Sequence, residues 1–137
     1  MKNIALVMGS FHTDLVEEMR QEAHKTAEGL GLKVHAEIWV PGSVEKPLAA
    51  QQLLKRSDID AVVLLGIIEK GGTKHGFTMG QSLMHFTMQL SLDYSKPVTL
   101  GVLGPDIDPD QIAPRTMPYA RAAVVAAAKM LEQDYKA

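Results

Sequence analysis

The sequence predicts a single α/β domain in which helices cover both faces of a four-stranded parallel sheet. Apolar runs of strand length alternate along the chain with stretches whose apolar residues recur at helical spacing. The run "AVVLLGII" at residues 61–68 lacks polar alternation, which is typical of a parallel strand covered on both sides. The chain has 137 residues, 46% of them hydrophobic, which suits one compact core. We therefore expect one doubly wound domain over residues 1–137.

The first half of the chain predicts two strand–helix units. Residues 4–9 form the first apolar run, and the helix after it carries an apolar stripe of Leu15, Met19, Ala23 and Leu30. The glycines in "GLGL" end this helix, and residues 33–40, "KVHAEIWV", read as the second strand. Pro41 and Gly42 stop that strand before a second helix marked by Leu48, Ala49, Leu53 and Leu54.

The second half repeats the pattern twice. Residues 60–68 form the third strand, and the following stripe is Met79, Leu83, Phe86 and Leu90. Residues 97–104, "PVTLGVLG", form the fourth strand, and the terminal helix carries Ala120, Val124, Ala127 and Leu131. The order βαβαβαβα implies right-handed crossovers in an open sheet. Ligands of such folds bind at the carboxyl ends of the strands.

Composition and charge exclude several classes of protein. Lys and Arg total 14 against 16 Asp and Glu, giving a net charge of -2 with no long block of one sign, so neither nucleic acid nor a membrane is an expected partner. The absence of cysteine excludes disulfides and thiolate zinc sites, and we expect no metal. The N-terminal apolar stretch is too short for a signal peptide or a membrane span. These observations predict a cytoplasmic protein with small-molecule or protein partners.

The four loops after the predicted strands carry the candidate chemistry: "GSFHTD", "PGSVEKP", "EKGGTKHGF" and "GPDIDPDQIAPR". In the third, Gly71 and Gly72 let a ligand approach the backbone, Thr73 adds a hydroxyl donor, and the next helix offers free N–H groups to an anion. His75 can transfer a proton near neutral pH. The same residues also suit an ordinary loop with a solvated histidine, so this loop by itself leaves both interpretations open.

The wider set of motifs resembles the lumazine synthase family. "SFH", "VPGSVEKPLA", "GGTKH" and "KPVTLGVLGPD", with Arg115 downstream, match family motifs in order and spacing over nearly the whole chain, most closely those of archaeal members. The resemblance implies a flavodoxin-like fold. It also implies condensation of 5-amino-6-ribitylaminouracil with 3,4-dihydroxy-2-butanone 4-phosphate to 6,7-dimethyl-8-ribityllumazine, in riboflavin biosynthesis. No metal or organic cofactor is implied.

The resemblance assigns roles to individual positions. Phe11 matches the ring on which the uracil stacks, and His12 stands next to it where the family usually has asparagine. Ser43 and Glu45 match positions that bind the ribityl chain. The remaining matches are Gly71 and Thr73 for the phosphate, His75 for proton transfer, Arg115 for the phosphate of a neighbouring subunit, and Arg121 as a looser second basic match.

Several positions depart from the family pattern. Val44 replaces an aromatic residue, Lys46 an aliphatic one and Gly72 an acidic one, while Gly76 and Phe77 follow the histidine in place of an aromatic or acidic pair. Leu100 stands where many bacterial members carry phenylalanine. We expect Val44, Gly72 and Leu100 to contact substrate all the same. The departures surround the heterocycle and the histidine, and they leave room for a related activity.

Other functions and the assembly state stay open at this level. A flavin-binding module and a shell-forming relative without catalysis are alternatives, and archaeal riboflavin synthase, a sister family, fits less well because it lacks the G-x-T-x-H arrangement. A response regulator is excluded because the third strand ends without an aspartate. The family resemblance and the Ala-rich stretch "YARAAVVAAAKM" predict a homopentamer, which can assemble further into a shell of sixty subunits.

Overall fold

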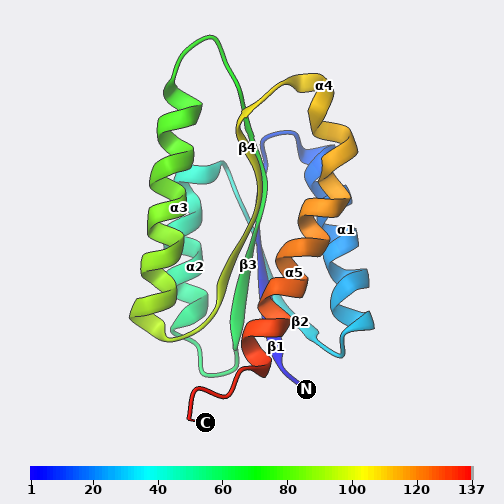
Figure 1. Ribbon diagram of the computed structural model, residues 1–137, viewed down its shortest axis with the longest axis vertical. Coiled ribbons are helices and arrows are strands. Elements are labelled where there is room, and N and C mark those ends of the chain that lie inside the picture. The colour runs from blue at the N-terminus through cyan, green and yellow to red at the C-terminus, as the bar shows by residue number, and fades with distance from the viewer. Residues whose placement is uncertain (137) are drawn as a thin grey trace.

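A computed structural model describes residues 1–136 and contains one four-stranded, all-parallel sheet (Figure 1). The strands are β1 (Asn3–Gly9), β2 (Lys33–Val40), β3 (Ala61–Glu69) and β4 (Val98–Ile107). Their spatial order is β2-β1-β3-β4, so β1 and β3 are the central strands. The predicted doubly wound α/β fold is confirmed.

Helices cover both faces of this sheet (Figure 1). On one face lie α1 (Thr13–Gly29) and α5 (Thr116–Glu132), and on the other α2 (Lys46–Leu54) and α3 (His75–Tyr94). Pro47 lies in the first turn of α2, where its missing N–H breaks no helical hydrogen bond. Among residues 1–136, no helix combines the length and the apolar character that a membrane span requires.

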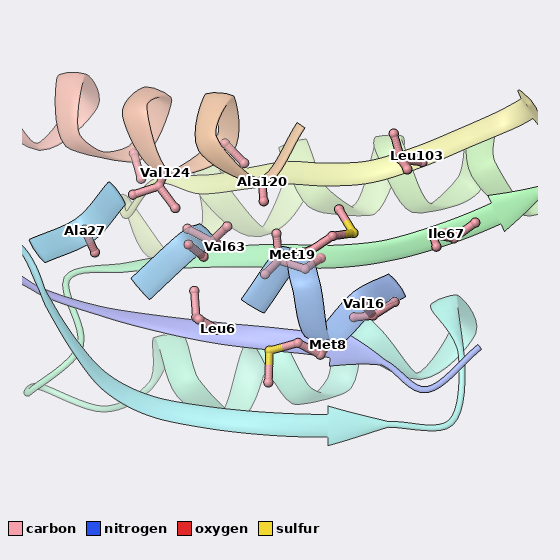
Figure 2. Close-up of a cluster of buried hydrophobic side chains, with 14 of the residues drawn as sticks. Leu6, Met8, Val16, Met19, Ala27, Val63, Ile67, Leu103, Ala120 and Val124 are labelled. Atoms are coloured by element: carbon pink, nitrogen blue, oxygen red, sulfur yellow. The ribbon is translucent and has the colours of Figure 1, made fainter. Parts of the chain in front are cut away.

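Two apolar layers, one on each face, hold the fold together. Figure 2 shows the layer between the sheet and α1 and α5, where Met8, Met19, Val63 and Val124 meet. The other layer packs α2 and α3 against the opposite face of the same strands. Every residue of β3 except Glu69 is buried, because its alternate side chains enter opposite layers. Burial on both faces therefore explains why this strand lacks polar alternation, as the sequence predicts.

Three members of the predicted helical stripes lie outside the core. Leu30 is 47% exposed, because α1 ends at Gly29 and Leu30 forms its cap. Leu48 and Phe86 lie on the outer sides of α2 and α3 and are 66% and 51% exposed. The other stripe residues are buried or pack against the core, so the spacing identified the helices correctly but overestimated the width of their buried faces.

The segment predicted as one long fourth loop, residues 104–115, is largely ordered into regular elements. β4 continues to Ile107, which pairs with Glu69 of β3, and a short helix α4 (Pro109–Ile112) and a 3-10 turn η2 (Ala113–Arg115) follow. The Gln111 side chain accepts a hydrogen bond from the Asp108 backbone N–H at 3.2 Å, which fixes the start of α4. A second 3-10 turn, η1 (Ser43–Glu45), precedes α2.

Met19→Ala should lower the free energy of unfolding by about 2–5 kcal/mol, because Met19 is fully buried between α1 and the sheet and its removal leaves a cavity. Leu30→Ala is the control and should stay within about 0.5 kcal/mol of wild type. Urea denaturation followed by circular dichroism measures both values. Equal losses for the two variants would contradict the assignment of this layer.

Candidate functional site

Three of the four strand-end loops meet at the carboxyl edge of the sheet and enclose a cavity of about 390 Å³. The predicted site residues that line it are Phe11, Ser43, Val44, Glu45, Gly71, Thr73 and His75. They come from the loop after β1, from η1, and from the segment between β3 and α3. Residues distant in sequence are thus brought together where parallel strands end, as the fold class predicts.

A second cavity of about 410 Å³ adjoins the first. The two share Ser43, Val44, His75 and Met79, and the second continues along α3 to Phe86. Its wall is mostly apolar, with Pro47, Leu83 and Phe86 beside a few hydroxyl groups. The combined space offers apolar surface for a flat ring and hydroxyl groups for polar atoms.

His75 lies at the junction of the two cavities and is the first residue of α3. Its backbone N–H donates to Thr73 Oγ1 at 3.3 Å, which satisfies one free N–H group at the start of the helix. The first turn of this 20-residue helix leaves N–H groups without helical partners, and they favour an anion. A Cβ atom at Gly71 or Gly72 would meet no other atom within 4 Å, so the backbone of this loop stays open to a ligand.

A cavity of about 350 Å³ lies against the same loop, and two of its lining residues are positively charged lysines. Lys70 and Lys74 line it together with Gly71 and Thr73. Lys70 Nζ lies 3.6 Å from Asp106, whose side chain is well exposed. Sequence reasoning assigned no role to the two lysines, although both belong to the quoted "EKGGTKHGF". No cluster of three or more His, Asp or Glu suited to a metal ion occurs in the part of the chain that the structure describes.

His12 flanks the first cavity without lining it. Its ring meets the Phe11 ring edge-on, with centroids 4.3 Å apart, and its backbone is left-handed with φ of 58°. Nε2 is buried, has no hydrogen-bond partner within residues 1–136, and lies 3.5 Å from the Glu69 carboxylate. Glu69 lines the cavity and was missed by sequence reasoning. Its position as the last residue of a buried strand was the available signal.

Besides His12, four predicted residues do not line this cavity. Gly72 is in the loop but not in the wall, and Leu100 pairs with Leu64 in the sheet and packs against the core on the α2 and α3 side. The two arginines lie on the side of α1 and α5. Arg115 donates to the Gln111 carbonyl at 2.9 Å, and Arg121 donates to Glu22 at 2.9 Å. A single chain therefore does not bring either arginine to His75.

A larger cavity, about 690 Å³, lies at the opposite end of the sheet. Lys2, Asp60, Lys96 and Pro97 from the amino ends of strands line it, and no predicted site residue does. The other histidines line neither of the two cavities at His75: His24 contacts Glu37, His35 contacts Asp58, and His85 lies edge-on to Phe86, behind the second cavity. Volume alone would thus select a region without the predicted chemistry.

Lys46 is the most unusual side chain near the site. It is the first residue of α2, is only 1% exposed, and reaches the two central strands at Gly9 and Gly66. A Cβ at Gly9 would lie 3.2 Å from Nζ, and one at Gly66 would collide with it, so these two glycines make room for the amine. Nζ donates to Ser43 Oγ at 3.0 Å, its one hydrogen bond among residues 1–136.

Burial lowers the pKa of Lys46 from 10.5 to about 8, and the neighbouring Glu45 carboxylate only partly opposes this effect. The unfolded chain therefore binds the proton more tightly than the folded one. Between about pH 8 and pH 10.5 the unfolded state holds more protons, so the free energy of unfolding rises with pH across this window. Keeping the ammonium buried at neutral pH lowers stability by roughly 3 kcal/mol.

Lys46→Met should raise the free energy of unfolding at pH 7 by about 1–3 kcal/mol, because methionine fills similar space without a charge. The difference between the variant and wild type should shrink as the pH rises through 8 toward 10.5. The control is Lys55→Met at an exposed position after α2, which should change stability by less than about 0.5 kcal/mol at every pH. Chemical denaturation at pH 7, 8, 9 and 10 measures all three proteins. A less stable Lys46→Met at pH 7 would contradict the account.

Comparison with known proteins identifies the family. The sequence profile of 6,7-dimethyl-8-ribityllumazine synthase matches residues 1–134. Proteins of that name are 41% identical in Staphylothermus marinus, over 98% of this chain and 89% of the relative, and 40% identical in Methanococcus maripaludis, over 97% and 96%. The relative in Methanopyrus kandleri is 41% identical over 95% of this chain and 92% of its own. The predicted similarity to archaeal members is confirmed, and the chain belongs to the 6,7-dimethyl-8-ribityllumazine synthase family.

Proposed function

We propose that this protein condenses 5-amino-6-(D-ribitylamino)uracil with 3,4-dihydroxy-2-butanone 4-phosphate to 6,7-dimethyl-8-ribityllumazine and releases phosphate, as a transferase of riboflavin biosynthesis. Membership of the family supports this activity over the whole chain. The observation that supports a particular site for this activity is the cavity lined by His75, Phe11, Ser43, Glu45 and Thr73. Nothing in the relatives or the cavity favours the flavin-binding module, the non-catalytic relative or riboflavin synthase.

The proposed roles of the heterocycle site follow from the chemistry of the lining. Phe11, 50% exposed, offers its ring face to the uracil. Val44, 67% exposed, extends this apolar surface where family members have an aromatic side chain. Ser43 and Glu45 supply a hydroxyl and a carboxylate for the ribityl hydroxyls. A flat, polar ring with a polyol chain thus finds complementary groups in one cavity.

The phosphorylated butanone is assigned to the loop after β3. Gly71 and Thr73, with the first turn of α3, form its phosphate site, and Lys70 and Lys74 add positive charge nearby. His75 would transfer protons as the amine attacks the ketone carbonyl, as water leaves to form the imine, and as phosphate departs. Its position between the two cavities suits this role.

A neighbouring copy would complete the site in a homopentamer. Arg115 is exposed and remote from His75 within one chain, so a phosphate contact from Arg115 requires a second subunit. Arg121, on the α1 and α5 side, and Leu100, on the α2 and α3 side, also lie away from the cavity, so substrate contacts from them would require a second subunit as well. Exposed apolar residues on α3, with Met88 57% and Leu92 74% exposed, support subunit contacts there. Twelve pentamers forming a sixty-subunit shell, and a cytoplasmic location, are further parts of this proposal.

The wild-type protein should form lumazine and release inorganic phosphate when given both substrates. General acid–base groups contribute about a hundredfold to ten-thousandfold to a rate, but the condensation proceeds partly unaided once the two substrates are bound together. His75→Ala should therefore lower kcat by roughly tenfold or more. His35→Ala, remote from the cavity, is the control. Steady-state kinetics with absorbance and phosphate detection measures these rates. Wild-type turnover no faster than the buffer reaction would overturn the proposed function.

Subunits carrying His75→Ala and subunits carrying Arg115→Ala should complement each other in a mixed assembly. With random equal mixing, about one interface in four has both wild-type groups, since each subunit is intact at its relevant position half the time. Activity should then recover toward roughly a quarter of wild type after co-refolding. Native mass spectrometry verifies mixing. A verified mixed assembly whose activity equals the average of its parents would refute the shared site.

A further inference from the structure

Lys46 occupies a position that an apolar side chain would fill at lower free energy. Its ammonium is buried, it has three N–H donors, and its one hydrogen bond among residues 1–136 is to Ser43 Oγ. Gly9 and Gly66 leave room for it at the carboxyl ends of the two central strands. Side chains that reduce stability in this way are found where function depends on them.

The hydrogen bond to Ser43 has a fixed direction while Lys46 is protonated. An ammonium can only donate, so the hydroxyl oxygen of Ser43 is the acceptor. Within residues 1–136 this is the hydrogen bond in which Ser43 Oγ takes part, so the Ser43 hydroxyl donates to no protein acceptor. Ser43 lines both adjoining cavities, so an oxygen atom of a bound ligand can accept a hydrogen bond from this hydroxyl.

We propose that Lys46 is a positioning residue, whose buried ammonium holds the Ser43 hydroxyl as a hydrogen-bond donor to an oxygen atom of the ligand. The identity of the ligand, the ribityl chain of the diamine substrate, rests on the proposed function. The donor direction rests on the geometry of Lys46, Ser43, Gly9 and Gly66 alone.

Deprotonation of Lys46 reverses the hydrogen bond. A neutral amine has a lone pair that can accept, so the Ser43 hydroxyl can turn its proton toward Nζ, and its donation to the ligand weakens. The groups packed around Nζ from β1, β3 and η1 are Gly9, Gly66 and Ser43, and none of them titrates near neutral pH. Glu45 is the neighbouring charge.

Three further titratable side chains surround the cavity: His12, Glu69 and His75. These three groups are the same in wild type and in Lys46→Met, so a comparison of the two proteins removes their contribution to the pH dependence. Since the pKa of Lys46 is about 8, a change in affinity above this pH that disappears with Lys46 reports on its amine.

The test is anaerobic titration calorimetry with the ribitylaminouracil alone, at pH 7 and pH 9.5, on the full chain. The proteins are wild type, Lys46→Met, Ser43→Ala, the double variant, and Lys55→Met as a control. At pH 7, Lys46→Met, Ser43→Ala and the double variant should all bind about three- to tenfold more weakly than wild type, since each loses the same hydrogen bond. Between pH 7 and pH 9.5, the affinities of wild type and Lys55→Met for the ligand should fall by about three- to tenfold relative to the affinity of Lys46→Met.

The positioning role would be overturned if Lys46→Met bound the ligand as tightly as wild type at pH 7, or if the losses in the double variant were additive. It would also be overturned if the affinity changed with pH in the same way with and without Lys46. The ligand's own titration cancels, because every protein is compared with the same ligand. The test also separates this inference from the proposed function, because it needs no turnover. Binding in the expected pattern by a protein that makes no lumazine would support the role of Lys46 and contradict the proposed activity. Failure of wild type to bind the diamine would overturn both.

Discussion

The parallel pairing of β1 and β3 is the constraint on which the site depends. These strands lie at the centre of the sheet, pair in register from Ile4 with Ala61 to Met8 with Leu65, and are covered on both faces. Neither face of the strands is open to a ligand. Polar chemistry is therefore confined to the strand ends, and parallel pairing brings the ends of β1 and β3 side by side. The cavity with Phe11 on one side and His75 on the other follows from this arrangement.

Lys46 shows how the two apolar layers make an unfavourable group tolerable. An unpaired ammonium is disfavoured in a buried position, and at the first residue of α2 the helix dipole opposes it further. The layers on both faces supply the stability that offsets this penalty. The buried ammonium places a positive charge at a fixed position beside Ser43. A surface lysine could not do so, because its side chain is solvated and free to move.

Much of the fold and part of the site follow from local sequence signals. The unbroken apolar run of β3 and the helical spacing of residues such as Met19 depend on burial alone, so they are visible without a structure. Leu30 and Leu48 look like core residues in sequence, but helix ends and packing angles decide which apolar residues are covered. The extension of β4 to Ile107 depends on pairing with Glu69, which no local pattern encodes.

The site residues divide in the same way. The loops that hold Phe11 and His75 were predicted to meet because the ends of parallel strands converge, and the family resemblance singled out the two residues. Lys46 was noticed only as a departure from an aliphatic residue, since its burial depends on the glycines of two other segments. The pairing of His12 with Glu69 is likewise a contact across two strand ends that their sequence separation hides. Arg115 matches a family motif in sequence, but within one chain it lies away from the cavity and donates to the Gln111 carbonyl.

The central claim is that the cavity between Phe11 and His75 binds the heterocycle and the phosphate together. A crystal structure of the protein with 6,7-dimethyl-8-ribityllumazine and inorganic phosphate tests it most directly. The account predicts the ring system against Phe11, the ribityl chain at Ser43, and the phosphate at the loop that holds Thr73. Lumazine bound instead in the cavity at the amino ends of the strands, beside Lys96, or absent from both cavities around His75, would contradict it.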